Sequence, residues 1–424
     1  MAESIHLKQA CRPCPVCGND TVEVLNHQRF VLPQECPLPD AFDVVWCLSC
    51  GLAYADTPAS QATYDRYYAD FSKYEDNLTS TGGAHSPADL LRLAETASTI
   101  ATGVPSRSAR VLDIGCANGG LLAALKALGY SDLVGVDPSA SCCERTRAVC
   151  DGKVMVGALR SLPPGLGAFD VVILSHVLEH VLDLNASVRK LSALLTHSGV
   201  VYLEVPDAKR YVDCLVAPFQ DFNTEHINHF GFFSLRNLLA TAGLSFVSGG
   251  TKDIPTDAGA RYPAVFGFFR RAPASRIPHP ESRIPNPDHG KWELDGEFRD
   301  RMIRYIELSR TQLQQIDTRI APLIEKGPLI VWGTGQLTLK LLAETSLGRA
   351  QIVAFVDGNP INQSKKLAGV SVVAPEGIAG LTHPILISTL LHEHAITERI
   401  RQQLRLTNPI ITLAPDNEAA FTQS

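Results

Sequence analysis

The sequence predicts an α/β protein of three domains, and three observations lead to that prediction. From residue 110 onward, apolar runs of strand length alternate with helical segments, the pattern of an open, mostly parallel sheet covered by helices. A second alternation of the same kind begins after Gly327-Pro328. Six cysteines lie within the first fifty residues of a 424-residue chain, which is too long for one ordinary core.

The expected boundaries follow from these shifts in pattern. Residues 1–58 form a cysteine-rich domain, 59–272 a central α/β domain, and 291–424 an amphipathic helix followed by a second α/β domain. Between them, residues 273–290 carry a nearly repeated segment beginning at Ser275 and Ser282. Proline at this density is incompatible with helix or interior strand, so we expect an extended linker or surface loop.

The individual elements are predicted from the spacing of apolar residues and from the glycines and prolines that end helices and strands. In the central domain we expect strands at 111–114, 133–136, 153–156, 169–174, 200–204 and 265–269, and helices at 60–68, 121–128 and 140–149. In the second α/β domain we expect strands at 329–332, 352–356 and 385–388, with helices at 337–344 and 393–404. A long amphipathic helix is indicated before it by Leu294, Phe298, Met302, Tyr305 and Ile306.

Composition excludes several classes of protein. A net charge of -6 and a pI near 6.1 argue against the concentrated basic face that binds nucleic acid. No apolar run reaches the ~20 residues of a membrane helix, and the first residues lack the pattern of a signal peptide. We therefore expect a cytoplasmic protein without a membrane partner, in which cysteines are metal ligands or buried residues rather than disulfides.

The turn after the first strand of the central domain predicts the cofactor. Residues 113–119 read D-x-G-x-x-x-G, whereas a dinucleotide-binding turn reads G-x-G-x-x-G because it clasps a pyrophosphate. S-adenosylmethionine has no pyrophosphate. Asp113 is expected to position its ammonium and Gly115 to let the backbone approach it, while Gly119 lets the next helix come close. Cys116 and Ala117 complete the predicted contact.

Later strand ends extend this predicted site, because ligands bind at the carboxyl ends of such strands. Asp137, 24 positions after Asp113, ends the second strand, where a carboxylate accepts hydrogen bonds from ribose hydroxyls. The other predicted cofactor contacts lie beside this residue or at the ends of the third and fourth strands: Pro138, Ala158, Leu159, Ser175 and His176. An NAD-binding or purely structural α/β domain is the alternative.

Two copies of C-x-x-C-G predict a metal site in the first domain. Cys14 and Cys17 form one pair, and Cys47 and Cys50 form the other. Two such pairs complete the tetrahedral Cys₄ arrangement of structural zinc, which leaves no position for a catalytic water. The spacer is longer than usual, so Cys11 or Cys36 remains an alternative ligand. Buried core cysteines are the alternative to any metal.

Histidines after the fourth and fifth strands are candidates for the chemistry. His180 follows the fourth strand, and Glu225-His226 follows the fifth. A neutral histidine there can accept a proton from a substrate hydroxyl or from a C–H next to a ketone. Glu225 is expected to fix the tautomer of a neighbouring histidine or to contact substrate. His229, beside an aromatic residue, is expected to be a packing residue.

With these motifs in this order, the chain resembles the three-domain sugar C-methyltransferases. The resemblance covers nearly all of the chain outside residues 273–290. It implies a zinc-binding N-terminal domain, a Rossmann-like (class I) S-adenosylmethionine methyltransferase domain and a C-terminal Rossmann-like domain. It also implies a nucleotide-linked keto-deoxysugar as substrate, bound between the domains.

The resemblance further implies roles for single residues. His226 would abstract the proton alpha to the ketone, Glu225 would be its partner, and His180 would match a second active-site histidine. Tyr68 would match a tyrosine near the sugar. The sequence departs from the family at Asn223, where the best-known members have tyrosine. An O-methyltransferase of a sugar or small metabolite, and a non-catalytic zinc-containing binding protein, are the alternative functions.

Overall fold

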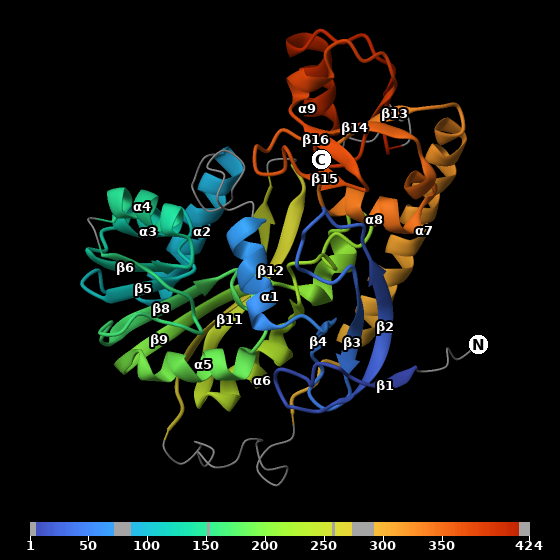
Figure 1. Ribbon diagram of the computed structural model, residues 1–424. Coiled ribbons are helices and arrows are strands. Elements are labelled where there is room, and N and C mark those ends of the chain that lie inside the picture. The colour runs from blue at the N-terminus through green and yellow to red at the C-terminus, as the bar shows by residue number, and fades with distance from the viewer. Residues whose placement is uncertain (1–5, 72–85, 151–152, 257–258, 274–291, 415–424) are drawn as a thin grey trace. The chain divides into compact units, whose positions relative to one another are not determined.

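The computed structural model describes residues 6–71, 86–150, 153–256, 259–273 and 292–414 (Figure 1). Contacts divide the chain into two compact units, the first formed by Met1–His27, Phe42–Cys214 and Thr224–Arg304, and the second by Gln28–Ala41, Leu215–Asn223 and Tyr305–Ser424. The predicted domain boundaries stay a prediction. Of the predicted linker, residues 274–290 lie outside the described residues.

The first unit contains a seven-stranded sheet with the order β11-β12-β9-β8-β5-β6-β7. Its parallel part consists of β5 (Arg110–Ile114), β6 (Asp132–Asp137), β7 (Val154–Val156), β8 (Phe169–Ser175) and β9 (Leu195–Pro206). An antiparallel pair, β11 (Leu244–Pro255) and β12 (Arg261–Arg271), is added next to β9. The mostly parallel sheet is confirmed, but β11 was not predicted because only two of its twelve residues are buried.

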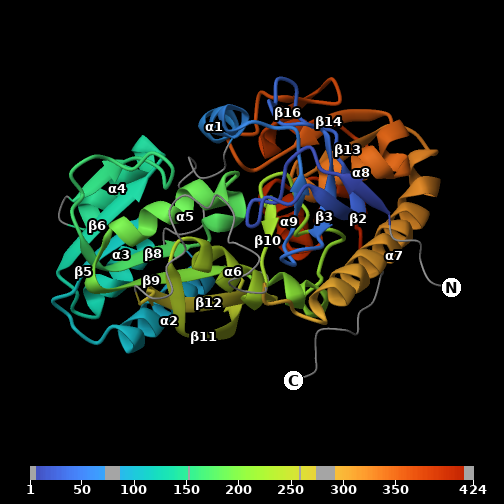
Figure 2. The same cartoon turned by 90° about the horizontal axis from the view of Figure 1, so that it is seen from below.

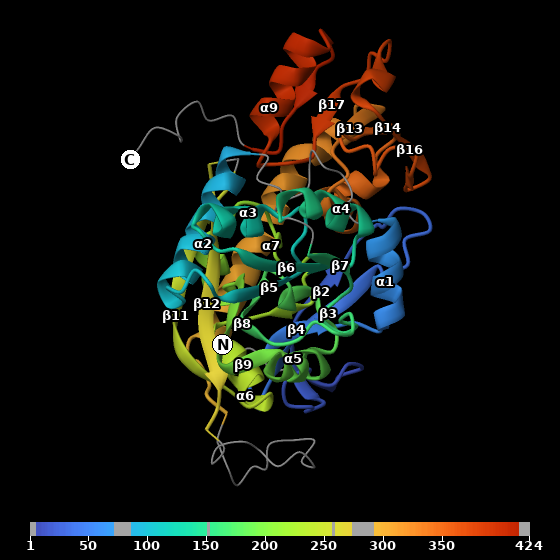
Figure 3. The same ribbon diagram turned by 90° about the vertical axis from the view of Figure 1, so that its left-hand side faces the viewer.

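Helices cover both faces of this sheet (Figure 3). On one face, α2 (Pro87–Gly103), α3 (Gly120–Ala127) and α4 (Ala140–Val149) share a core with alternate strand residues, including Val111, Val171 and Ile173. On the other face, α5 (Leu184–Ala193) and α6 (Phe232–Thr241) pack against the intervening residues, including Leu112, Val172 and Leu174. Because both faces are buried, the strands are continuous apolar runs that the sequence reveals.

A second sheet of five strands follows the order β1-β2-β3-β4-β10, in which β1 with β2, β3 with β4 and β4 with β10 are antiparallel pairs. Its strands are β1 (Leu7–Gln9), β2 (Thr21–Arg29), β3 (Ala41–Cys47), β4 (Ala53–Asp56) and β10 (Asn228–His229). The edge strand β10 comes from a distant part of the chain and pairs with β4, Asn228 opposite Tyr54 and His229 opposite Ala53. None of these strands was predicted. Their pairing ties the cysteine-rich segment to residues 228–229 of the central domain.

The buried guanidinium of Arg12 strengthens this connection. Arg12 is 8% exposed, and it donates to the carbonyl of Leu182 (2.6 Å), the side-chain oxygen of Asn228 (3.0 Å) and the carbonyls of Ala55 (3.2 Å) and Ile227 (3.3 Å). Burial lowers the pKa of this guanidinium to about 10, which leaves it charged at neutral pH. One side chain therefore holds together the loops that follow β8 and β9.

The second unit contains a six-stranded sheet with the order β15-β16-β14-β13-β17-β18. Figure 2 shows β13 (Leu329–Trp332), β14 (Ile352–Val356) and β16 (Val370–Val373) side by side. The remaining elements are β15 (Lys366–Leu367), β17 (Ile385–Ile387), β18 (Ile410–Ile411), α8 (Gln336–Glu344) and α9 (Glu393–Glu398). The predicted β13, β14, β17 and α8 are confirmed to within a residue, whereas the short β15, β16 and β18 were not predicted.

The long predicted helix is α7 (Phe298–Ile324), which buries Phe298, Met302, Tyr305 and Ile306. The prediction was wrong for Leu294, which precedes the helix and is 53% exposed. The side chain of Asp295 accepts a hydrogen bond from the backbone of Glu297 (3.0 Å), which is a local turn that competes with helix. Within the described residues, neither α7 nor another helix is long and apolar enough to cross a membrane.

We predict that Arg12→Met destabilises the first unit. Four acceptors lose their donor, three of them in buried contacts, and leaving such groups unpaired costs about 1–3 kcal/mol for each one that water cannot reach. Urea unfolding should show a fall of about 3 kcal/mol or more. The exposed Arg189 is the matched control, and Arg189→Met should leave the transition unchanged. An equal effect of both substitutions would contradict the prediction.

Candidate functional site

The turn between β5 and α3 is shaped by two glycines. Gly115 and Gly119 have φ values of +83° and +81°, a region that side chains with a Cβ rarely adopt. A Cβ on Gly119 would also lie 2.8 Å from a methyl carbon of Thr146 on α4, and a Cβ on Gly115 would lie 2.7 Å from Val177. Both glycines are therefore required by the close approach of neighbouring segments.

Two carboxylates lie at the strand ends beside this turn. Asp137 accepts hydrogen bonds from the backbone amides of Ala117 (2.8 Å) and Ser139 (2.9 Å). Asp113 is 2% exposed, and its burial, together with the charge of Asp137, raises its pKa to about 7. A buried carboxyl with a raised pKa is stabilised in its charged form by a nearby cation. The pair thus fits the ammonium and ribose of S-adenosylmethionine.

The remaining predicted cofactor residues lie around the same strand ends, with different exposure. Cys116 is buried in the core with its sulfur against Gly135, so only its main chain is available at the turn. Pro138 is exposed, Ala158 is half-buried, and Leu159 is buried in the core. Gly157 donates its backbone N–H to the Asp137 carbonyl (3.0 Å), which keeps the segment from residue 157 to 159 beside the end of β6.

Ser175 ends β8, and His176 follows it with a φ of +56°. The ring of His176 lies between two buried carboxylates, with Nδ1 3.2 Å from Glu179 Oε1 and Nε2 3.3 Å from Glu204 Oε1. Burial alone would lower the pKa of His176, but these two partners raise it to about 9. Both ring nitrogens are engaged, which leaves the main chain of His176 for the predicted cofactor contact.

Glu204 on β9, which contacts His176, has further polar partners. Its second oxygen is 2.5 Å from Lys252 Nζ and accepts a hydrogen bond from Tyr202 (2.5 Å). Burial alone would raise the pKa of Glu204, but His176 and Lys252 lower it to about 2. The negative charge of this fully buried carboxylate is thus balanced by two cations.

His180, Tyr68 and Glu225 come together at the same edge. His180 Nδ1 lies 3.1 Å from the Tyr68 hydroxyl and 3.0 Å from the backbone oxygen of Glu225. A carbonyl oxygen only accepts, so this contact assigns the proton to Nδ1 and leaves the lone pair on Nε2. The Glu225 carboxylate accepts a hydrogen bond from Tyr67 (2.8 Å). Both tyrosines are on α1 (Gln61–Asp70), which the sequence predicted.

His226 lies against His180, edge to face, with ring centroids 4.9 Å apart. One nitrogen from each ring and a carboxylate oxygen of Glu179 all lie within 4.8 Å of one another.

The predicted packing residue His229 is fully buried on β10, and burial lowers its pKa to about 3. Asn223 belongs to the second unit, where its amide donates to the carbonyl of Gln220 (3.2 Å).

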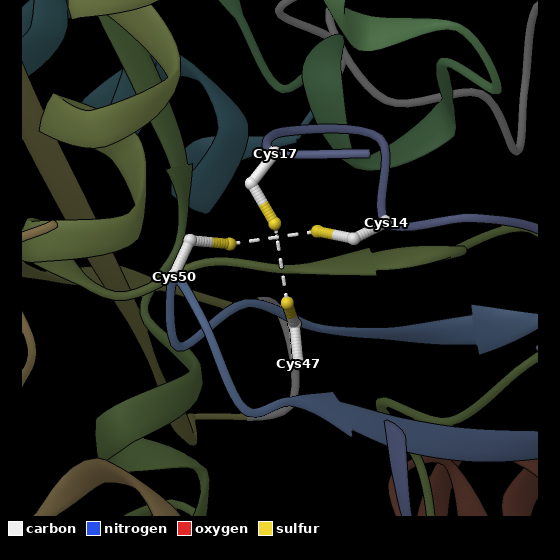
Figure 4. A group of neighbouring side chains, drawn as sticks. All are labelled: Cys14, Cys17, Cys47 and Cys50. Carbon is white, nitrogen blue, oxygen red and sulfur yellow. Dashed lines mark hydrogen bonds between the residues drawn. The ribbon is translucent and has the colours of Figure 1, made fainter. Parts of the chain in front are cut away.

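The four cysteines of the two C-x-x-C-G segments, here called knuckles, converge on one point (Figure 4). Their sulfurs lie within 4.8 Å of one another, at 3.4 Å for Cys14 and Cys50 and 3.3 Å for Cys17 and Cys47. Gly18 and Gly51 follow the knuckles with φ values of +76° and +70°. Four sulfurs in this arrangement suit tetrahedral Zn²⁺. The described four-sulfur cluster includes neither Cys11 nor Cys36.

Several residues of the site were not predicted from the sequence. Glu179 lies between His176 and His180 in the sequence, and Tyr67 precedes Tyr68. Their positions next to predicted site residues could have pointed to them. Arg12 lies between Cys11 and Cys14, where it has the appearance of a surface residue. Glu204 is the last residue of the strand predicted at 200–204, and no role was predicted for it.

A family model described as a methyltransferase domain matches residues 85–248. This range contains β5, the glycine turn, both carboxylates and His180. No curated protein matches the sequence.

Solved methyltransferase structures are similar to about half of the chain. The 1,6-didemethyltoxoflavin N1-methyltransferase of Burkholderia thailandensis, with bound S-adenosylhomocysteine, is 18% identical over 54% of this chain and 97% of that chain, with a TM-score of 0.39. The magnesium protoporphyrin IX methyltransferase of Synechocystis is 16% identical over 50% and 100%, with a TM-score of 0.37. The CcbJ methyltransferase of Streptomyces caelestis is 17% identical over 48% and 99%, with a TM-score of 0.36.

Residues 85–248 therefore form a class I methyltransferase domain, and the chain is an S-adenosylmethionine-dependent methyltransferase.

Proposed function

We propose that this methyltransferase methylates a carbon atom of a nucleotide-linked keto-deoxysugar. The observation that supports this most is the cluster of His226, His180, Tyr68 and the Tyr67–Glu225 pair near the carboxyl ends of the strands. It offers a histidine base together with hydroxyl groups that can donate hydrogen bonds. Carbon methylation needs both, because a C–H must be deprotonated and the resulting oxyanion stabilised.

In this proposal S-adenosylmethionine supplies the electrophilic methyl group. Asp113 holds its ammonium and Asp137 its ribose hydroxyls, and the glycine turn brings the backbone close to it. His226 takes the proton from the carbon alpha to the ketone. A tyrosine hydroxyl at this edge stabilises the enolate oxygen, and alignment of the enolate carbon with the methyl group is the main remaining task.

We also propose that Cys14, Cys17, Cys47 and Cys50 bind a structural zinc ion. Burial raises the pKa of the Cys14 thiol, so a thiolate at this position needs a cation beside it. A site closed by four sulfurs has no open position for substrate. Its expected contribution is to the fold of the segment that carries Arg12.

The proposed role of Asp113 predicts how cofactor binding depends on pH. The free protein holds this carboxyl with a pKa of about 7, and the ammonium favours its charged form, so binding below pH 7 should release a proton. Affinity should rise about tenfold from pH 6 to pH 8. Calorimetry in two buffers of different ionisation enthalpy measures the proton release, which Asp113→Asn should abolish. Equal proton release by both proteins would contradict the assignment.

The proposed zinc site predicts that Cys47→Ser removes the metal. Structural zinc sites contribute about 10 kcal/mol or more of binding free energy at pH 7, so the variant should melt at a lower temperature and contain less than one zinc per chain. Elemental analysis and circular dichroism measure both. Cys36→Ser, which changes a cysteine outside the four-sulfur cluster, is the control and should keep its zinc. A full equivalent of zinc in Cys47→Ser would refute the site.

The proposed base predicts an isotope experiment. In D₂O with S-adenosylhomocysteine and a panel of nucleotide-linked 3-keto and 4-keto sugars, the enzyme should exchange the alpha proton of its substrate. His226→Asn should slow this exchange by about 10²–10⁴-fold, whereas the exposed control His197→Gln should not. Full turnover of His226→Asn would remove His226 from the chemistry, and a methyl group found on oxygen would replace the carbon methyltransferase with an O-methyltransferase.

A further inference from the structure

Glu179 has no role in the proposed chemistry, yet its buried carboxylate lies beside His180 and His226. Its side chain is 1% exposed. One oxygen contacts His176, and the other, Oε2, has no hydrogen-bond partner among the described residues. A buried carboxylate oxygen without a donor is costly, and such an atom points to a missing proton donor or ion.

The tautomer of His180 indicates that an ion, rather than a proton donor, is missing beside Glu179. Its Nδ1 proton is directed to the backbone oxygen of Glu225, so its lone pair is on Nε2. This nitrogen lies 4.0 Å from Glu179 Oε1, the oxygen that also contacts His176. Two atoms that both carry lone pairs therefore lie close together. A ring nitrogen of His226 completes the group, with all three donor atoms within 4.8 Å of one another. A cation among them would turn this mutual repulsion into attraction.

The outer contacts are those of metal ligands. A ligating histidine usually donates its other ring N–H to a carbonyl or carboxylate, and a ligating carboxylate is itself hydrogen-bonded. His180 donates to the Glu225 carbonyl, and Glu179 contacts His176. Two imidazoles and one carboxylate favour Zn²⁺, Co²⁺, Mn²⁺ or Fe²⁺ over Ca²⁺ and Mg²⁺. Bonds of about 2.0–2.2 Å require the donor atoms, which lie within 4.8 Å of one another, to move closer together around the ion.

We propose that Glu179, His180 and His226 bind a divalent transition-metal ion that competes with the substrate proton for His226. A neutral imidazole has a single lone pair, so a ligating His226 has none left to accept a proton. Bound metal therefore inhibits abstraction of the alpha proton. The binding of the ion is independent of the proposed function, whereas the inhibition rests on it.

The first test measures binding without any substrate. Protein that already contains one zinc per chain is titrated with Co²⁺ by calorimetry and visible absorption. One further equivalent should bind, with the ligand-field bands of a nitrogen and oxygen site and without thiolate charge-transfer absorption. Glu179→Gln and His180→Gln should each weaken this binding at least tenfold. Absence of a further equivalent, or unchanged affinity in folded variants, overturns the proposal.

Two exposed residues provide matched controls. Glu95 on α2 and His197 on β9 lie on the solvent side of their elements, and Glu95→Gln and His197→Gln should bind Co²⁺ as the unchanged protein does. Thermal melting checks that every variant is folded. If Glu179→Gln does not fold, His180→Gln decides the binding result alone, because a partly exposed ring contributes less to the core than a buried carboxylate.

The second test measures competition. Exchange of the alpha proton in D₂O should be lost as Co²⁺ fills the site and should return after dialysis, and in Glu179→Gln the inhibition should need at least tenfold more Co²⁺. Exchange that continues or becomes faster with one bound equivalent overturns the competition. A protein that binds Co²⁺ but never exchanges the proton of any offered keto sugar refutes the proposed function and leaves the metal site standing.

Discussion

The buried Arg12 guanidinium is the contact on which the geometry of the site depends. It joins the cysteine-rich segment to Leu182 and Asn228, residues that lie two positions after His180 and His226. A charged group in the interior is stable only with several acceptors around it, so the fold has to bring these loops to Arg12. The amide of Asn228 then donates to the carbonyls of Leu178 and Val181 (both 2.8 Å).

This arrangement makes residues 6–60 a support for the loops that carry His180 and His226. The Cys14–Cys17 pair lies between β1 and β2, and the Cys47–Cys50 pair lies where β3 ends and before β4 begins. The strand β10 extends that sheet, and Arg12 lies two residues before Cys14. The loops that carry His180 and His226, which we propose as ligands and as base, are thereby held by the sheet of β1 to β4 and β10 and by Arg12. Precise side-chain placement generally requires such a supporting layer, because a displacement of about 1 Å is enough to lower a rate substantially.

Charge is distributed unequally along the edge of the central sheet. Around Glu204, the cations His176 and Lys252 match the buried carboxylate, which stabilises the fold. Around Asp113, burial and then the charge of the neighbouring Asp137 raise the pKa of the carboxyl, so ionising it in the free protein leaves a local excess of negative charge. A cationic ligand removes this excess, and a site that is unfavourable alone and favourable when filled is typical of functional positions.

Parts of this structure follow from the sequence alone. The central strands are predictable because burial on both faces makes them continuous apolar runs, and the spacing of the cysteines predicts a common cluster because paired knuckles are local structures. The strands β1 to β4 and β11 were not predicted. In β1 and β11 few residues are buried, so the apolar signal is weak, and β4 is buried throughout but has only four residues. The turn beside Asp113 was recognised because its glycines are required by local backbone geometry.

Only the tertiary structure decided which of the candidate residues meet. Arg12 and Asn228 are 216 positions apart, and Tyr67 and Glu225 are 158 positions apart, so no local pattern could connect them. The unpartnered oxygen of Glu179 is likewise a property of its buried surroundings rather than of its neighbours in the chain. Sequence thus determined the sheet, the glycine turn and the cysteine pairs, which depend on short-range geometry. Folding decided the hydrogen bonds and charges among distant residues, because these form only when separate loops reach the same edge of the sheet.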